Sequence, residues 1–143
     1  MTSQAASLPV CGSARPRLRA IVVHHRNSEL LDHCLRAALA STGVDLDIVL
    51  FENECREALP DWVAHDPRIH RLASPGTIGF GEANNRAVEW SRRNLPPVEG
   101  YFFLNNDAVV RHDTLDRLAS VLREQPGAAA AGPLILIWGA EDH

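Results

Sequence analysis

The chain has 143 residues, of which 45% are hydrophobic and 22% are charged, and its formal net charge at pH 7 is −4. This length is enough for one domain with its own hydrophobic core. The acidic balance and the lack of a basic block argue against nucleic-acid binding, which usually needs clustered Lys and Arg. No apolar run reaches the ~20 residues of a transmembrane helix, so we expect no membrane-spanning segment.

The cysteines and the N-terminal composition indicate a cellular compartment. Cys11, Cys34 and Cys55 are odd in number and have no CxxC spacing, which argues against a disulfide framework or a four-cysteine zinc site. Reduced thiols are typical of the cytosol, so we predict a cytoplasmic protein. Residues 1–17 are rich in Ala, Ser, Pro and Arg and lack the apolar stretch of a signal peptide. We therefore predict a disordered leader at 1–17 and one domain at 18–143.

From residue 18 onward, strand patterns alternate with helix patterns. Short runs rich in Ile, Val and Leu predict buried strands at 18–24, 47–51, 69–73, 101–104 and 128–137. Apolar residues at helical spacing, with caps and breakers, predict helices at about 28–42, 82–94 and 114–125. Such alternation predicts an α/β fold with a mostly parallel sheet flanked by helices.

Polar segments directly follow three of the predicted strands, at 24–27, 52–55 and 105–107. In parallel α/β sheets, ligands bind outside the carboxyl ends of the strands, so we expect the functional site there. A loop with three glycines, at 74–81, precedes the second predicted helix. Glycine permits a close approach of backbone to ligand, and a helix N-terminus can bind a diphosphate. The loop is not a P-loop, because the Lys and the GK[ST] ending are missing.

Five motifs occur in a fixed order between residues 18 and 137. They are AIVVHHRNSELL from Ala20, IVLFEN from Ile48, IGFGEANNRA from Ile78, FLNNDAVV from Phe103 and GPL from Gly132. In order and spacing they resemble family-2 glycosyltransferases, and FLNNDAVV is similar to L-L-N-P-D-T-x-V, that family's form of the metal-binding DxD motif. Within the family, the motifs look most like those of bacterial rhamnosyltransferase-like enzymes that build cell-surface polysaccharides.

The resemblance implies the GT-A fold, a Rossmann-like parallel sheet with flanking helices. It also implies transfer of a sugar, with inversion, from a nucleotide-diphospho-sugar donor to a hydroxyl of a saccharide or glycolipid acceptor. A divalent metal, Mg²⁺ or Mn²⁺, would neutralise charge on the leaving diphosphate. Asp107 is the predicted ligand of this metal; the alternative is that Asp107 only caps the turn before Asp113.

Eight residues are predicted by the resemblance to contact the nucleotide sugar. They are His24, Arg26, Glu52, Gly79, Ala83, Asn84, Asn105 and Asn106. Glu52 takes the place of the family's Asp after the second strand, with a solvated loop acid as the alternative. Asn105 stands where the first carboxylate of DxD would be, and Asn53 is expected to shape its turn. His24 and His25 cannot readily chelate one ion, because consecutive strand residues point to opposite faces.

No catalytic residue is predicted, because nothing after Asp107 matches the acidic-aromatic segment that carries the family's general base. We therefore expect the N-terminal half of an enzyme, truncated at its C-terminus, with an uncovered apolar face, a tendency to self-associate and little activity alone. The alternative is a nucleotide-sugar-binding module without catalysis. A sugar nucleotidyltransferase would need a basic glycine-rich loop after the first strand, and a Rossmann oxidoreductase would need GxGxxG there; neither is present.

Overall fold

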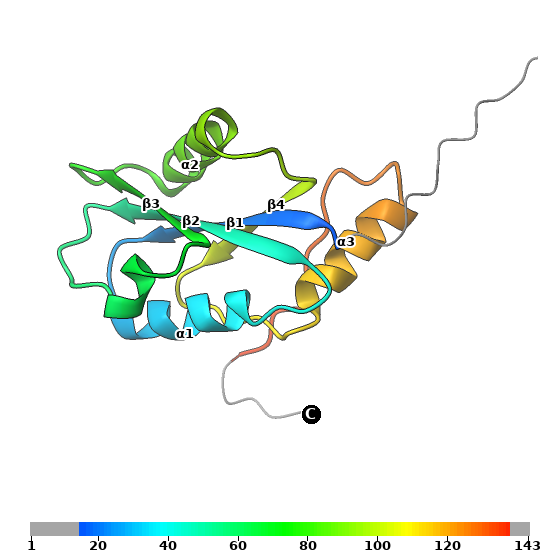
Figure 1. Ribbon diagram of the computed structural model, residues 1–143, viewed down its shortest axis with the longest axis horizontal. Coiled ribbons are helices and arrows are strands. Elements are labelled where there is room, and N and C mark those ends of the chain that lie inside the picture. Colours follow the sequence, from blue (N-terminus) through cyan, green and yellow to red (C-terminus); the bar gives the residue numbers. More distant parts are fainter. Residues whose placement is uncertain (1–14, 138–143) are drawn as a thin grey trace, which may run out of the picture.

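The centre of the molecule is a four-stranded parallel sheet with the strand order β3-β2-β1-β4 (Figure 1). The computed structural model describes residues 15–137. The strands are β1 (Arg17–His24), β2 (Asp45–Asn53), β3 (Ile69–Ser74) and β4 (Gly100–Asn105). All three neighbouring pairs are parallel. This confirms the predicted parallel α/β sheet and brings the four carboxyl ends to one edge.

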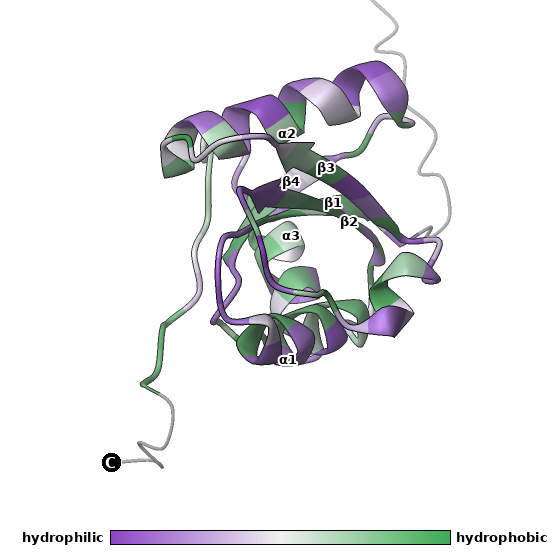
Figure 2. Ribbon diagram, turned by 90° about the vertical axis from the view of Figure 1, so that its left-hand side faces the viewer, coloured by the Kyte–Doolittle hydropathy of each residue, from purple (hydrophilic) through white to green (hydrophobic). Residues whose placement is uncertain are grey.

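Helices cover both faces of the sheet and make three layers. Figure 2 shows α2 (Phe80–Asn94) on one face, and α1 (Ser28–Leu39) and α3 (Thr114–Glu124) on the other. The 3₁₀ turn η1 (Asp61–Ala64) lies between β2 and β3 in the sequence. Within residues 15–137, none of the helices is long and apolar enough to cross a membrane.

The core follows the two-residue period of β1. Ala20 and Val22 pack in the cluster beneath α1, whereas Ile21 and Val23 pack in the cluster beneath α2. All four side chains are buried. Because successive side chains of a strand point to opposite faces, an uninterrupted aliphatic run is what a strand covered on both faces requires.

The predicted strand at 128–137 was wrong, because this segment has no regular secondary structure. Among the described residues, β4 is the last strand of the sheet and the segment pairs with none of its neighbours. A strand needs a hydrogen-bonded partner, and aliphatic composition does not supply one. The side chains of four consecutive residues are 64–86% exposed: Leu134, Ile135, Leu136 and Ile137.

Element ends differ slightly from the sequence prediction. β1 begins at Arg17, one residue inside the predicted leader, because Arg17 pairs with Asp45 of β2. α2 begins at Phe80 rather than residue 82, and the Ala83 amide already donates to the Gly79 carbonyl at 2.9 Å. Residues 1–14 of the predicted leader lie outside the described residues.

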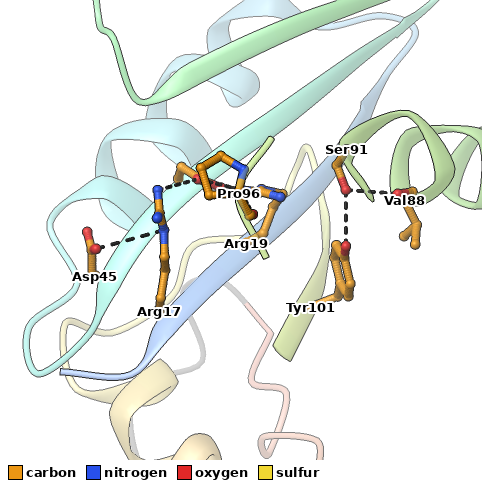
Figure 3. A network of polar contacts seen from close by, with 8 residues as sticks. Arg17, Arg19, Asp45, Val88, Ser91, Pro96 and Tyr101 are labelled. Carbon is orange, nitrogen blue, oxygen red and sulfur yellow. Dashed lines mark hydrogen bonds and ion pairs between the residues drawn. The ribbon is translucent and has the colours of Figure 1, made fainter. Parts of the chain in front are cut away.

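A buried ion pair ties together the amino-terminal end of the sheet (Figure 3). Arg19 of β1 is fully buried, and its Nε and Nη2 donate to the Asp47 carboxylate of β2 at 2.5 and 2.7 Å. Nη2 also donates to the Pro96 carbonyl, which follows α2, at 3.2 Å. The hydrogen bond to Asp47 raises the pKa of Arg19, so the buried guanidinium stays charged. This network lies at the end of the sheet opposite the predicted site.

Candidate functional site

A polar pocket of about 370 Å³ lies at the carboxyl ends of β1, β2 and β3. Its walls come from the segments that follow these three strands, so residues distant in sequence meet there. The lining residues are His25, Arg26, Glu54, Arg56, Glu57 and Thr77.

Two carboxylates of the pocket wall are already engaged by the protein. Glu57 accepts hydrogen bonds from the Ser28 amide at 2.8 Å and the Ser28 hydroxyl at 2.9 Å. Glu54 accepts from the amide and hydroxyl of Thr77 and from Arg56. Backbone hydrogen bonds from Asn27 and Ser28 lower the pKa of Glu57, and the Thr77 hydroxyl lowers that of Glu54. Both groups therefore stay ionised and fix the loops that form the pocket.

His25 and Arg26 line the pocket, and each has a polar group that a ligand can bind. The Nδ1 atom of His25 lies 2.7 Å from the Asn53 carbonyl. A carbonyl can only accept, so Nδ1 carries the proton, and Nε2 of the neutral ring is an acceptor. The side chain of Arg26 makes no ion pair with any residue between 15 and 137, and the residue is exposed. The pocket thus offers an acceptor and a cation to a ligand.

Asn53, the last residue of β2, clamps the loop that leads into α2. Its Nδ2 donates to the Ile78 carbonyl and its Oδ1 accepts from the Ile78 amide, both at 2.9 Å. The residue is only 5% exposed. Asn53 was expected to shape its own turn, but its side chain instead holds a loop 25 residues further along the chain. The reciprocal pairing fixes Gly79 and the first turn of α2 beside the ends of β2 and β3.

Replacing Asn53 with Ala should destabilise the fold by about 1–3 kcal/mol, because the Ile78 amide and carbonyl would lose their partner in a half-buried loop. Urea unfolding monitored by circular dichroism measures this change. Asn94→Ala is the matched control, because Asn94 is exposed and its amide bonds only to the preceding turn of its own helix. An Asn53→Ala variant as stable as the control would contradict the clamp.

The turn after β4 carries the predicted metal ligand. Asn105 and Asp107 are exposed, and the Ala108 amide donates to the Asn105 carbonyl at 3.1 Å to close the turn. The Asp107 carboxylate forms no hydrogen bond or ion pair with any other described residue. Its side chain therefore does not cap this turn. Within residues 15–137, no three His, Cys, Asp or Glu side chains gather closely enough to hold a metal by themselves.

The side-chain amide of Asn106 joins this turn to the pocket. Its Nδ2 donates to the Arg26 carbonyl at 2.9 Å and lies 3.1 Å from Nδ1 of His24. Arg26 lines the pocket, and Asn106 directly precedes Asp107. The pocket and the Asp107 carboxylate therefore belong to one continuous edge of the sheet.

Solved structures share the fold that carries this site. Mannosyltransferase PcManGT from Pyrobaculum calidifontis, in complex with GDP-Man and Mn²⁺, superposes with a TM-score of 0.65 at 19% identity, over 77% of this chain and 33% of that chain. Residues 1–349 of S. aureus TarS superpose with a TM-score of 0.62 at 14% identity, also over 77% of this chain and 33% of that chain. This chain has the GT-A fold of glycosyltransferases.

The sequence comparison points in the same direction. The succinoglycan biosynthesis protein ExoO of Rhizobium meliloti (strain 1021) is 28% identical over 105 residues, which are 72% of this chain and 29% of the relative. No protein-family model matches the chain. The chain thus spans about a third of the length of the GT-A proteins and of the relative that it matches.

At the edge of this GT-A sheet, seven of the eight predicted nucleotide-sugar contacts fall into two groups. His24, Arg26 and Asn106 are in hydrogen-bonding contact, and Asn105 lies beside them at the end of β4. The other group surrounds the start of α2: Gly79 is exposed, Ala83 is buried in the core, and Asn84 is 7% exposed. Nδ2 of Asn84 donates to the Phe80 carbonyl at 2.8 Å, and its buried Oδ1 has no hydrogen-bond partner among residues 15–137.

Glu52 is held by a neighbouring strand. Its carboxylate accepts from Nε of Arg71 at 2.8 Å and from Nη2 at 3.1 Å, and its side chain is only 14% exposed. Glu52 is therefore not the solvated loop acid that the sequence left open. Any ligand that reaches it also meets the guanidinium of Arg71.

None of His25, Glu54, Arg56, Glu57 and Thr77 is among the eight predicted contacts, although His25, Glu54 and Thr77 lie in the segments 24–27, 52–55 and 74–81 that the sequence singled out. Position was the only available signal, because each of these residues lies a few places after a strand end. The family pattern gave no guidance at 54–58, where the sequence departs from it.

Proposed function

We propose that this chain is the nucleotide-sugar-binding part of a metal-dependent, inverting family-2 glycosyltransferase that acts in cell-surface polysaccharide or glycoconjugate synthesis. The observation that carries the proposal is the junction of the polar pocket with the exposed Asp107 carboxylate, made by the 2.9 Å bond from Asn106 to the Arg26 carbonyl. The similarity to a succinoglycan biosynthesis protein supports the process. Solved structures of the same fold are complexes with GDP-Man and Mn²⁺ or with UDP-GlcNAc.

The pocket suits a nucleoside, and the β4 turn suits its diphosphate. Nε2 of His25 can accept a hydrogen bond from the base or ribose, and the Arg26 guanidinium can pair with phosphate. Asn84 Oδ1, buried without a partner at the start of α2, is an acceptor for a sugar hydroxyl. Under this proposal the protein orients the donor across the edge of the sheet.

The residues of the β4 turn fit a hard divalent cation. Asp107 supplies an exposed, unpaired carboxylate and Asn105 a neutral amide oxygen, and Mg²⁺ or Mn²⁺ readily completes such a set with phosphate oxygens and water. The lack of a three-ligand protein cluster within residues 15–137 agrees with this mode of binding. When bound, the cation would neutralise the charge of the leaving diphosphate.

The second candidate is a nucleotide-sugar-binding module without transferase activity of its own. The exposed aliphatic side chains at 134–137 suit either candidate, because such a surface associates with another chain in water. We propose self-association through this segment. For either candidate we propose the cytoplasm, with a saccharide or glycolipid as the acceptor of the transfer reaction.

Isothermal titration calorimetry of the chain with UDP-, GDP- and dTDP-sugars, with and without Mn²⁺, tests the proposed function. We expect one donor to bind, and Mn²⁺ to tighten its binding about tenfold or more, because Asp107 would hold a cation that neutralises charge on the diphosphate. Release of the nucleoside diphosphate in the same samples separates the two candidates. A chain that binds none of the donors contradicts both.

A further inference from the structure

The side-chain N–H groups of Asn106 bond to the last residue of β1 and to the connection between β1 and α1. The Arg26 carbonyl can only accept, so the amide nitrogen of Asn106, not its oxygen, must face this side. The same nitrogen lies 3.1 Å from Nδ1 of His24, which must then be an acceptor. Asn106 therefore binds the end of β1 and the pocket wall at once.

His24 is a rigid anchor for this contact. The residue is fully buried, and desolvation lowers its pKa, so the ring is neutral with its proton on Nε2. The carboxylates of Glu57, in the loop after β2, and of Glu52, on β2, raise the pKa of His24, but by less than burial lowers it. Nε2 itself has no partner among the described residues.

The contact lies where the backbone ladder stops. The paired register of β1 and β4 ends at Val23 and Asn105, so the turn that carries Asp107 is not held to β1 by main-chain hydrogen bonds. The bonds from Asn106 to His24 and Arg26 are the next connection beyond the ladder. The Cys34 thiol of α1 also donates to the Asn105 carbonyl, at 3.3 Å, so these side-chain bonds hold the turn that carries Asp107.

We propose that Asn106 and His24 form a positioning clamp that sets the Asp107 turn at a fixed distance from the nucleoside pocket, and that His24 acts on the ligand through Asn106 and not by touching it. This inference rests on the proposed function, in which one nucleoside diphosphate spans the pocket and the Asp107 cation. A ligand of fixed length binds well only when its two subsites are held at the matching separation. The clamp therefore matters for the diphosphate and cation together, and less for a nucleoside in the pocket.

Two substitutions of His24 separate the clamp from direct ligand contact. In His24→Asn, the side-chain oxygen can take the place of Nδ1 and still accept from Asn106. In His24→Gln, the amide reaches the position of Nε2 and the Nδ1 acceptor is lost. We expect His24→Gln and Asn106→Ala to weaken Mn²⁺-dependent binding of UDP or GDP about five- to tenfold, as for one or two lost hydrogen bonds. His24→Asn should retain most of this binding.

Calorimetry with UDP and with GDP, each with and without Mn²⁺, reads out the effect, and Asn94→Ala on α2 is the control. Metal-free binding should change less than about twofold in Asn106→Ala, since the pocket itself stays formed. Equal losses with and without Mn²⁺ would make Asn106 a purely structural residue and overturn the proposal. Binding that survives in His24→Gln but not in His24→Asn would show direct contact through Nε2 and also overturn it.

A thermal-unfolding cycle of His24→Gln, Asn106→Ala and the double variant tests the clamp without any ligand. The two shifts in melting temperature should be strongly non-additive, because both substitutions break the same hydrogen bond. Additive shifts would refute the clamp. If the wild type binds neither nucleotide while the cycle is non-additive, the proposed function fails and the contact stands only as a structural one, which overturns its positioning role.

Discussion

Replacing Asp107 with Ala should remove the Mn²⁺-dependent part of nucleotide binding and leave the fold intact. Asp107 is exposed and no hydrogen bond or ion pair ties its carboxylate to another described residue, so its loss breaks no contact of the fold. It is also the one carboxylate of the turn after β4, so a cation placed there would lose its only charged protein ligand. We expect affinity for UDP or GDP in the presence of Mn²⁺ to fall by at least about tenfold. Calorimetry and the circular dichroism spectrum measure the two effects.

Two variants control for charge and for position. Asp107→Asn keeps the shape but removes the charge, and it should lose most of the metal-dependent binding. Asp45→Asn removes a charge from the opposite end of the sheet, where the Asp45 side chain is 70% exposed, and it should bind like the wild type. Metal-dependent binding that persists in Asp107→Ala would show that the cation binds elsewhere.

Replacing Arg19 with Met should cost about 3–5 kcal/mol of folding free energy, the largest stability effect we expect in this chain. The substitution leaves the Asp47 carboxylate, 8% exposed, without its buried partner. It also removes the link to the Pro96 carbonyl. Urea unfolding of the variant measures the loss.

The double variant Arg19→Met/Asp47→Leu separates the pair from the packing. Two apolar side chains in place of two charges should recover most of the lost stability, because no charge remains buried without a partner. Arg86→Met is the surface control, because Arg86 pairs with Glu82 in solvent and both side chains are 53% exposed. A single Arg19→Met variant within about 1 kcal/mol of the wild type would contradict the importance of the buried pair.

Features encoded locally could be predicted from the sequence. The run from Ala20 to Val23 is aliphatic at every position, which is what burial on both faces of a parallel strand demands, and β1 is buried there as expected. Polar residues directly after β1, β2 and β4 indicated which edge of the sheet carries the site. The pocket does lie at this edge, although most of its lining residues were not predicted.

Features that depend on pairing between distant segments could not be predicted. The sequence suggested no ion-pair partner for Glu52, but the parallel register of β2 and β3 brings Arg71 to its carboxylate. His24 and Asn106 are 82 residues apart, and only the adjacency of β1 and β4 joins them. For the segment 128–137, a strand was predicted from composition alone. It pairs with no strand among the described residues and forms no regular structure.

α2 is pinned at both ends. Asn53 forms two hydrogen bonds with Ile78, two residues before α2 begins. Arg19 donates to the carbonyl of Pro96, two residues after α2 ends. Because both ends are bonded to strands, we expect α2 to move only as a rigid body together with the sheet. Under the proposed function, accommodation of a bulkier or smaller base then falls to the residues at 54–60, which have no regular secondary structure and are held largely by side chains such as Glu54 and Glu57.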